Sequence, residues 1–210
     1  MWEIIQQGGI MMIPISICSL AGIAIIVERL FALRKKKIIK KEIINLIDSL
    51  KGSEDIRLAK SLCSENPGMF ANIIQVGLEN INSDSEEISK LIEDQGRQEV
   101  HTLERGLVAL ETIAGISPLL GLLGTVLGMI RVFDVISLEG IGMASQLSAG
   151  ISEALITTVA GLAIGIFALV FYNYFSAKAE DIVLDIEKYS TRLIKRLQGF
   201  SEEKEKVTTE

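Results

Sequence analysis

The sequence predicts an all-α integral membrane protein with three transmembrane helices. Its mean hydropathy is +0.39 and 49% of its residues are hydrophobic, yet 23% are charged, so apolar and charged residues must be segregated along the chain. Three runs contain no Asp, Glu, Lys or Arg, at residues 10–27, 113–130 and 154–177. Each is long enough to cross a bilayer, which takes roughly 20 apolar residues with ~17–25 tolerated. No segment has the alternating pattern of a strand.

The composition argues against several classes of function. A net charge of −6 is unfavourable for binding nucleic acid. Cys18 lies in an apolar run, Cys63 lies in a polar region and His101 is the only histidine, so we expect neither a disulfide nor a metal site. The chain contains no phosphate-binding loop, HExxH motif or nucleophile elbow. We therefore expect no enzymatic activity and no metal or organic cofactor.

The distribution of basic residues predicts the orientation, because Lys and Arg concentrate on the cytoplasmic side of membrane proteins. Seven of them follow the first run, namely Arg29, Arg34, Lys35, Lys36, Lys37, Lys40 and Lys41. The basic run from Arg34 to Lys41 is also expected to contact anionic lipid. Glu3 is the only charged residue before the first run. The run therefore lacks the basic start of a signal peptide, and we interpret it as a retained helix. We expect the N-terminus outside and the C-terminus in the cytoplasm, although Arg131 lies near an outer helix end and departs from the trend.

These patterns divide the chain into consecutive segments. They are an external N-terminus (1–9), the first transmembrane helix (10–28), a cytoplasmic helical region (29–112), the second transmembrane helix (113–133), a short external loop (134–152), the third transmembrane helix (153–177), a cytoplasmic helix (178–200) and a disordered tail (201–210). Within the cytoplasmic region, apolar spacing predicts helices at 42–50, 55–64 and 70–81, with a turn at Asn66-Pro67-Gly68. A capping box at 83–86 precedes a helix that continues into the second span.

Small residues line both the second and the third span. They are Pro118, Gly121, Gly124 and Gly128 in the second span, and Gly161 and Gly165 in the third, where Thr157 continues the same face. Glycine is a poor helix residue in water, costing about 1 kcal/mol against Ala. In a bilayer the backbone must satisfy its own hydrogen bonds, so a helix forms anyway and the small residues allow close helix contact. We interpret these six residues as helix-packing positions.

Three polar residues in or beside these spans have two interpretations each. Thr125 and Thr158 either donate to a carbonyl of their own helix one turn earlier, or face a cavity and supply hydroxyls to an ion, a water or a carboxylate. Glu153 either marks the water interface or, if buried deeper, favours its protonated form and handles protons. Arg131 is a candidate ion-pair partner of Glu153, since both lie near the outer ends of their helices.

Two blocks of sequence resemble the ExbB/TolQ/MotA family of proton-channel subunits. Residues 118–128, PLLGLLGTVLG, are similar to the family pattern P-x-x-G-L-x-G-T-V-x-G. Residues 150–162, GISEALITTVAGL, are similar to its pattern G-I-x-E-A-L-x-x-T-x-x-G-L. The resemblance covers the whole chain, and three spans rather than four fit the ExbB/TolQ branch.

The resemblance implies a subunit of an ion-driven motor in the bacterial inner membrane. Five copies, brought close by the glycines, would surround a dimer of a single-span ExbD- or TolR-like partner with an essential Asp. Thr125 and Thr158 then correspond to pore-facing threonines and Glu153 to a membrane glutamate. The motor would couple the proton motive force, or a Na⁺ gradient, to work in the periplasm or at the outer membrane through a TonB- or TolA-like protein.

The rival interpretation is a non-conducting membrane scaffold that anchors a protein complex. A scaffold would need the glycines for packing, but it would not need Thr125, Thr158 or Glu153.

Overall fold

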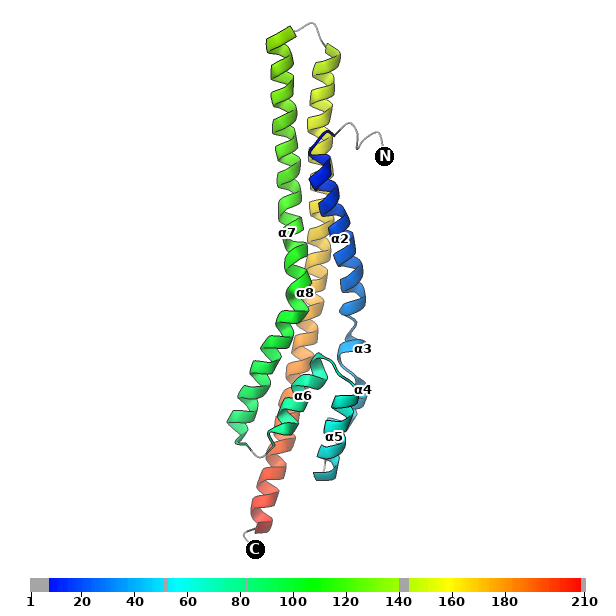
Figure 1. Ribbon diagram of the computed structural model, residues 1–210. Helices are drawn as coiled ribbons and strands as arrows, with labels where there is room; N and C mark the ends of the chain where they lie inside the picture. Colours follow the sequence, from blue (N-terminus) through cyan, green and yellow to red (C-terminus); the bar gives the residue numbers. More distant parts are fainter. Residues whose placement is uncertain (1–7, 51–52, 82, 140–143, 209–210) are drawn as a thin grey trace. The chain divides into compact units, whose positions relative to one another are not determined.

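The computed structural model describes residues 8–50, 53–81, 83–139 and 144–208, which form helices joined by short connections and contain no strand (Figure 1). The helices are α2 (Met12–Ala32), α3 (Lys35–Ile38), α4 (Lys41–Ser49), α5 (Ser53–Glu65), α6 (Met69–Glu79), α7 (Ser85–Glu139) and α8 (Ala144–Thr208). By length and composition, α2, α7 and α8 can each cross a membrane. The predicted all-α membrane fold with three spanning helices is therefore confirmed.

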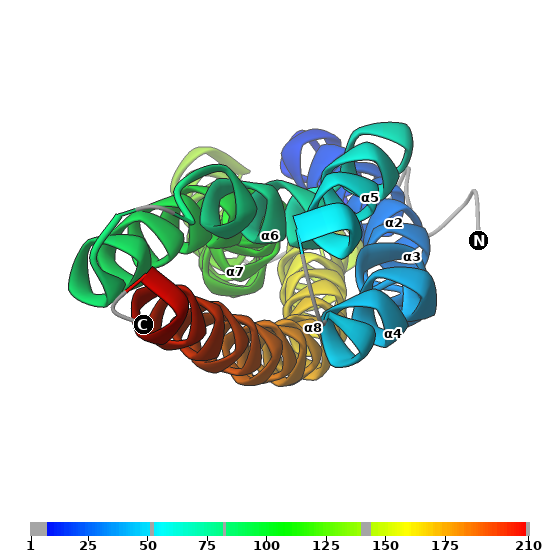
Figure 2. The same ribbon diagram turned by 90° about the horizontal axis from the view of Figure 1, so that it is seen from below.

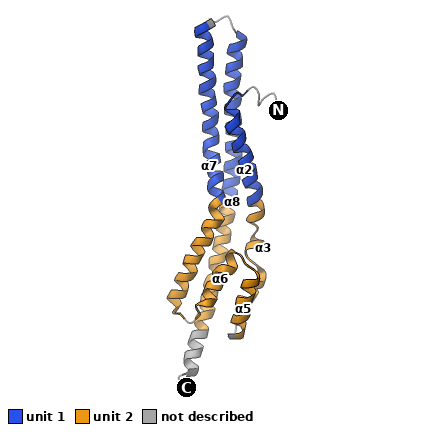
Figure 3. Ribbon diagram, in the orientation of Figure 1, with its two compact units in different colours: residues 1–29, 106–175 blue, residues 30–105, 176–210 orange. Residues whose placement is uncertain are grey.

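The helices group into two compact units (Figure 3). Unit 1 comprises Met1–Arg29 and Gly106–Phe175, and unit 2 comprises Leu30–Arg105 and Ser176–Glu210. The long helices α7 and α8 each contribute one part to unit 1 and another to unit 2. Unit 1 contains the apolar parts of α2, α7 and α8.

In unit 1, α2 packs on one side and exposes the other. Ile13, Ile17 and Leu20 are each more than 60% exposed, and they share one helix face. On the packed side, a Cβ added to Gly22 would lie 3.8 Å from Cγ2 of Ile113 on α7. An exposed face that carries several large aliphatic side chains suits contact with lipid.

Helix α7 continues through Pro118 without interruption. Proline has no amide and therefore cannot donate to the carbonyl of Ala114, four residues earlier. Beside it, Oγ of Ser117 donates to the carbonyl oxygen of Ile113 at 2.7 Å. Helix α8 is close at this level, since a Cβ added to Gly165 would lie 2.6 Å from Cγ of Pro118. Side-chain hydrogen bonds and a neighbouring helix are the usual compensation for proline inside a membrane helix.

In unit 2, α6 packs against both long helices, and the view from below shows it beside them (Figure 2). A Cβ added to Gly77 of α6 would lie 2.8 Å from Ile92 of α7 and 3.0 Å from Leu193 of α8. The fully buried Phe70 meets Tyr189 edge to face, with ring centroids 5.8 Å apart. The apolar face of α6 thus forms the centre of this unit.

Polar contacts attach α3 and α4 to α8 within unit 2. The guanidinium of Arg192 donates to both carboxylate oxygens of Asp48, at 2.8 and 3.0 Å. Lys35 forms an ion pair with Asp185, and the hydrogen bond between the two side chains raises the pKa of Lys35. On the inner side of α4, Ile43 is buried, as the predicted amphipathic helix at 42–50 requires.

The structure differs from the sequence expectations at several helix ends. Residues 134–139 and 144–152, expected in a loop, belong to α7 and α8, because hydropathy marks the edge of the lipid and not the end of a helix. The expected tail is helical up to Thr208. Helix α7 starts at Ser85, whose amide donates to Oδ1 of Asp84 at 2.8 Å, so Asp84 precedes the helix in place of the expected Ser83. The expected external N-terminus lies outside the described residues except for 8 and 9.

Candidate functional site

Small residues hold α7 and α8 in backbone contact within unit 1. A Cβ added to Gly121 would lie 2.8 Å from the carbonyl oxygen of Thr157, and one added to Gly161 would lie 2.5 Å from that of Ser117. Such distances leave no room for any side chain larger than hydrogen. The other predicted packing residues, Pro118, Gly124, Gly128 and Gly165, lie in the same contact. The close approach at these glycines is therefore between two helices of one chain.

Thr125 of α7 and Thr158 of α8 face each other in this contact. Their hydroxyls are hydrogen-bonded to one another, and both side chains are half-buried. Oγ1 of Thr158 lies 3.2 Å from the carbonyl oxygen of Gly121 on the opposite helix. Oγ1 of Thr125 lies 3.3 Å from the carbonyl oxygen of Ala154 on α8, and 3.2 Å from that of Gly121 on its own helix. The two hydroxyls thus form a pair that bridges the helices.

The hydroxyl pair has a specific hydrogen-bonding capacity. Each hydroxyl has one hydrogen to donate and two lone pairs that accept. The two hydrogens have three acceptors within reach, which are the carbonyl oxygens of Gly121 and Ala154 and the oxygen of the other hydroxyl. Lone pairs remain to accept from a protonated group or to contact a cation. A carboxylate could be bound only if a hydroxyl turned away from its carbonyl.

The neighbouring Thr157 behaves differently from Thr158. It is fully buried against α7, and its hydroxyl donates to carbonyls of its own helix, those of Ala154 at 2.9 Å and Glu153 at 3.2 Å. Thr157 is therefore a packing residue with a satisfied hydroxyl. Thr158, one position later, turns to the opposite helix instead.

Glu153 and Arg131 form the ion pair that the sequence suggested. The Glu153 side chain is only 14% exposed, whereas that of Arg131 is 60% exposed. Gly9, which precedes α2, lies against the carboxyl group of Glu153, and a Cβ there would lie 2.6 Å from its Cδ. The φ of +64° at Gly9 is a second reason for glycine at this position. The segment before α2 therefore closes over the buried carboxylate.

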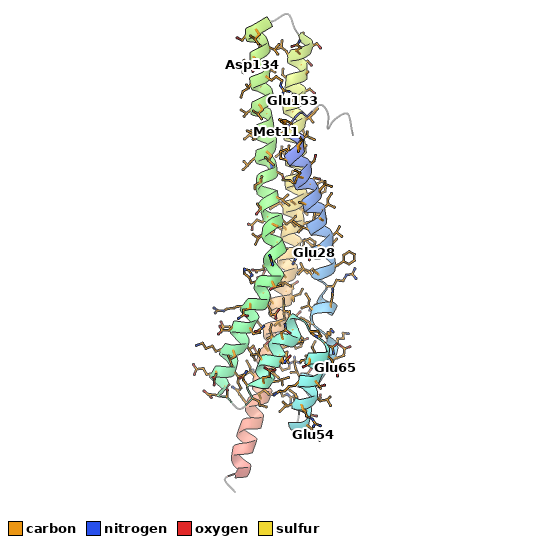
Figure 4. All side chains as sticks on the ribbon, viewed as in Figure 1. Met11, Glu28, Glu54, Glu65, Asp134 and Glu153 are labelled. Atoms are coloured by element: carbon orange, nitrogen blue, oxygen red, sulfur yellow. The ribbon has the colours of Figure 1, made fainter. Side chains whose placement is uncertain are left out.

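A cavity of about 260 Å³ adjoins the ion pair. It is lined by residues of α7, of α8 and of the segment before α2, including Met11, Asp134 and Glu153, which Figure 4 labels in the same region. Gly9, Met11 and Asp134 were not predicted from the sequence as part of a site. The pair Gly8-Gly9 directly before an apolar run was the available signal for a close approach.

The structure does not bring Glu153 to the hydroxyl pair. Its carboxylate contacts Arg131 and Gly9, whereas the hydroxyls of Thr125 and Thr158 contact each other and backbone carbonyls. Unit 1 thus contains two polar sites at different levels, the hydroxyl pair and the ion pair. Among the residues that the structure describes, no three His, Cys, Asp or Glu side chains are placed to hold a metal ion.

Comparison with known proteins identifies the family. A sequence model of the MotA/TolQ/ExbB proton channel family matches residues 65–188, more than half of the chain, and this range includes both polar sites except for the segment before α2. The ExbB-like 3 biopolymer transport protein of Synechocystis is 33% identical over 172 residues, which cover 81% of this chain and 82% of that protein.

Two further relatives carry the names of both branches. The biopolymer transport protein exbB1 of Vibrio cholerae is 31% identical over 191 residues, covering 87% of this chain and 82% of that protein. The Tol-Pal system protein TolQ of Haemophilus influenzae is 34% identical over 106 residues, covering 49% of this chain and 46% of TolQ. The resemblance inferred from the two sequence blocks is confirmed. With its three spanning helices and these relatives, the chain is a multi-pass membrane protein that belongs to the MotA/TolQ/ExbB proton channel family, with an ExbB- or TolQ-like role.

Proposed function

We propose that this chain is the multi-span subunit of an ion-driven motor, and that Thr125 and Thr158 line its ion path. Five copies surround a dimer of a single-span ExbD- or TolR-like partner, which carries an acidic residue in its span. The ion is H⁺, with Na⁺ as the alternative. The partner transmits work to a TonB- or TolA-like protein in the periplasm or at the outer membrane.

The observation that carries this proposal is the hydroxyl pair between α7 and α8. The surrounding exposed surface of both helices is apolar, with Leu122 and Val126 on α7 and Leu155 and Leu162 on α8. A pair of hydroxyls at one level of an apolar wall is a place where a partner carboxyl group finds hydrogen bonds. Elsewhere on that wall an ionised carboxylate has no partner, so it takes up a proton instead.

The hydrogen-bonding capacity of the pair suggests two states. A protonated partner carboxyl donates to a lone pair of Thr125 or Thr158, and both hydroxyls keep their own bonds to Gly121 and Ala154. An ionised carboxylate needs donors, so it draws a hydroxyl hydrogen away from a backbone carbonyl. The two protonation states of the partner therefore favour different positions of the inner dimer. Each charge that crosses the membrane field supplies about 2.3 kcal/mol per 100 mV.

Glu153 has a second role in the proposal, at the outer mouth of the path. Its ion pair with Arg131 balances the charge of a carboxylate that is largely buried. The adjoining cavity, which Arg131, Asp134 and Glu153 line, supplies a space in which an ion approaches the level of Thr125. Removing one member of such a pair leaves the other buried without a partner, which is costly.

The basic residues after α2 support an orientation with the N-terminus in the periplasm and the C-terminus in the cytoplasm of the inner membrane. In this orientation unit 2 lies in the cytoplasm, and the chain requires neither a cofactor nor enzymatic chemistry. The exposed apolar faces of α7 and α8 supply surface both for neighbouring copies and for lipid. Native mass spectrometry of the purified complex measures the number of copies, with five expected.

The test replaces single hydroxyls and measures ion flux. The chain and its single-span partner are reconstituted in proteoliposomes, and a potassium diffusion potential drives proton uptake, followed with a pH-sensitive dye. Thr125→Val and Thr158→Val should each lower the flux at least tenfold, because a hydrogen bond to a charged group is worth ~1.5–3 kcal/mol and 1.36 kcal/mol corresponds to about a factor of ten in rate. Thr125→Ser and Thr158→Ser should retain most of the flux.

Thr157→Val is the matched control, because Thr157 bonds only to its own helix. Its flux should stay within about twofold of wild type, because the buried Thr157 hydroxyl bonds only to carbonyls of α8 and has no part in the hydroxyl pair. The scaffold interpretation predicts no ion flux for the wild type or for any variant. If the wild type conducts, and Thr125→Val and Thr158→Val conduct as well as Thr157→Val, the proposed ion path along the hydroxyl pair is wrong.

A further inference from the structure

Unit 2 contains a larger cavity of about 670 Å³ between its parts of α7 and α8. Its apolar lining includes Ile73 of α6, Ile92 and Val100 of α7, and Ile186 of α8. The volume is in the range of sites that bind small molecules or a few peptide side chains, ~300–1,000 Å³. The site has no part in the ion path, since all its residues belong to unit 2.

Three Glu residues, one Arg (Arg97) and His101 line this cavity beside its apolar residues, so carboxylates outnumber cationic side chains. Glu93 lines it but is bound by Arg97 of the next turn at 2.6 Å. Glu104 of α7 and Glu187 of α8 also line it, are exposed, and have no side-chain hydrogen bond or ion pair among the described residues. Two free carboxylates on two helices favour a cationic occupant and disfavour an anionic lipid headgroup or a nucleic acid.

A buried hydroxyl independently indicates that the cavity accommodates a ligand. Ser190 of α8 lines the cavity and is 95% buried, with only 5% of its surface exposed. Within the described part of the chain, its Oγ is the one buried side-chain oxygen or nitrogen without a hydrogen-bond partner. Serine in a helix usually donates to the carbonyl one turn earlier, and an unsatisfied buried hydroxyl costs ~1–3 kcal/mol. A polar group that enters the cavity beside Ser190 would remove that cost.

We propose that this cavity binds a basic, amphipathic peptide segment, the stretch of the single-span partner that directly precedes its membrane helix. The inference rests on the proposed function, which supplies such a partner and places unit 2 in the cytoplasm. A single-span protein that works in the periplasm has its N-terminus inside, and basic residues concentrate on that side of its span. Lys or Arg side chains pair with Glu104 and Glu187, while apolar neighbours enter between Ile92 and Ile186. The segment anchors the partner to one copy of this chain.

Site-specific photocrosslinking in the native host tests this proposal. The photoreactive residue p-benzoylphenylalanine replaces Thr191, which lines the cavity and is exposed, in the full-length chain. After irradiation the complex is purified, and mass spectrometry identifies the crosslinked peptide. The expected adduct is a Lys- or Arg-containing peptide that directly precedes the span of a single-span protein. The same residue at Leu184, exposed on α8 outside the cavity, should give less than a tenth of that adduct.

Charge variants identify the groups that recognise the segment. Glu104→Gln with Glu187→Gln should lower the adduct yield at least tenfold. Glu87→Gln with Glu180→Gln is the matched control, because it removes the same charge from exposed positions of α7 and α8 outside the cavity, and its yield should stay within twofold. Equal yields from the two double variants would overturn the proposal.

The remaining outcomes separate this inference from the proposed function. An adduct with a second copy of the chain, or no adduct although a single-span protein co-purifies and ion flux is normal, overturns the docking proposal alone. If no single-span protein co-purifies with the chain at all, the docking proposal and the proposed function both fail.

Discussion

A single methyl group at Gly121 should disrupt the contact between α7 and α8. In Gly121→Ala the new Cβ would lie 2.8 Å from the carbonyl oxygen of Thr157 and 3.1 Å from Cα of Thr158. Both neighbours are backbone atoms, so no side-chain rotation relieves the overlap. Ordinary contact begins at 3.4 Å, so the helices must separate locally by about 0.6 Å. The hydrogen bond from Thr158 to the carbonyl of Gly121, now 3.2 Å, then lengthens beyond hydrogen-bonding distance.

The matched control is Gly115→Ala, on the same helix, where an added Cβ meets no atom within 4 Å. Both substitutions gain the same helix propensity, so the difference between them isolates the overlap. We expect Gly121→Ala to be less stable than Gly115→Ala by ~1–3 kcal/mol, the usual cost of overpacking. Flux should fall about fivefold, because one hydrogen bond of the hydroxyl pair, worth ~1 kcal/mol, is lost.

Stability is measured as the SDS fraction at which a pair of dyes, attached to α7 and α8, separates in mixed micelles. Flux is measured in proteoliposomes with the single-span partner, as for the threonine variants. Equal stability and equal flux for Gly121→Ala and Gly115→Ala would refute the inference that backbone contact at Gly121 sets the geometry of the hydroxyl pair.

Two further predictions concern the ion pair and a buried thiol. Arg131→Glu should destabilise unit 1, and the charge exchange Arg131→Glu with Glu153→Arg should restore part of the lost stability. A double-mutant cycle of SDS unfolding should give a coupling energy of ~1 kcal/mol between the two positions. A coupling energy of zero would contradict a functional pair. Burial raises the pKa of the Cys63 thiol from 9.0 to about 11, so at pH 8 in a Cys18→Ser background maleimide should label the folded chain ~100-fold more slowly than the SDS-unfolded chain. Because the folded state favours the neutral thiol, the stability that Cys63 contributes is present below pH 9 and is lost as the pH rises toward 11. Cys63→Ala should remove this loss of stability at alkaline pH. Equal labelling rates for the folded and the unfolded chain would contradict the raised pKa of Cys63.

The sequence by itself determined the fold class, the three spanning helices and the family. These properties are local, since a run without charges predicts a span wherever it occurs. The blocks at 118–128 and 150–162 are contiguous motifs and require no knowledge of packing. Helix ends were less predictable, because helices α7 and α8 continue beyond their apolar runs to Glu139 and from Ala144.

The tertiary structure alone decided which groups meet. Thr157 and Thr158 are adjacent and chemically identical, and each residue turns the helix by about 100°. Only the rotation of α8 against α7 shows that Thr157 satisfies its own helix while Thr158 reaches Thr125. The glycines likewise indicated close contact without naming the partner, which is the other long helix of the same chain. Such pairings depend on helix rotation and on contacts between residues about thirty positions apart, and no local pattern in the sequence encodes them.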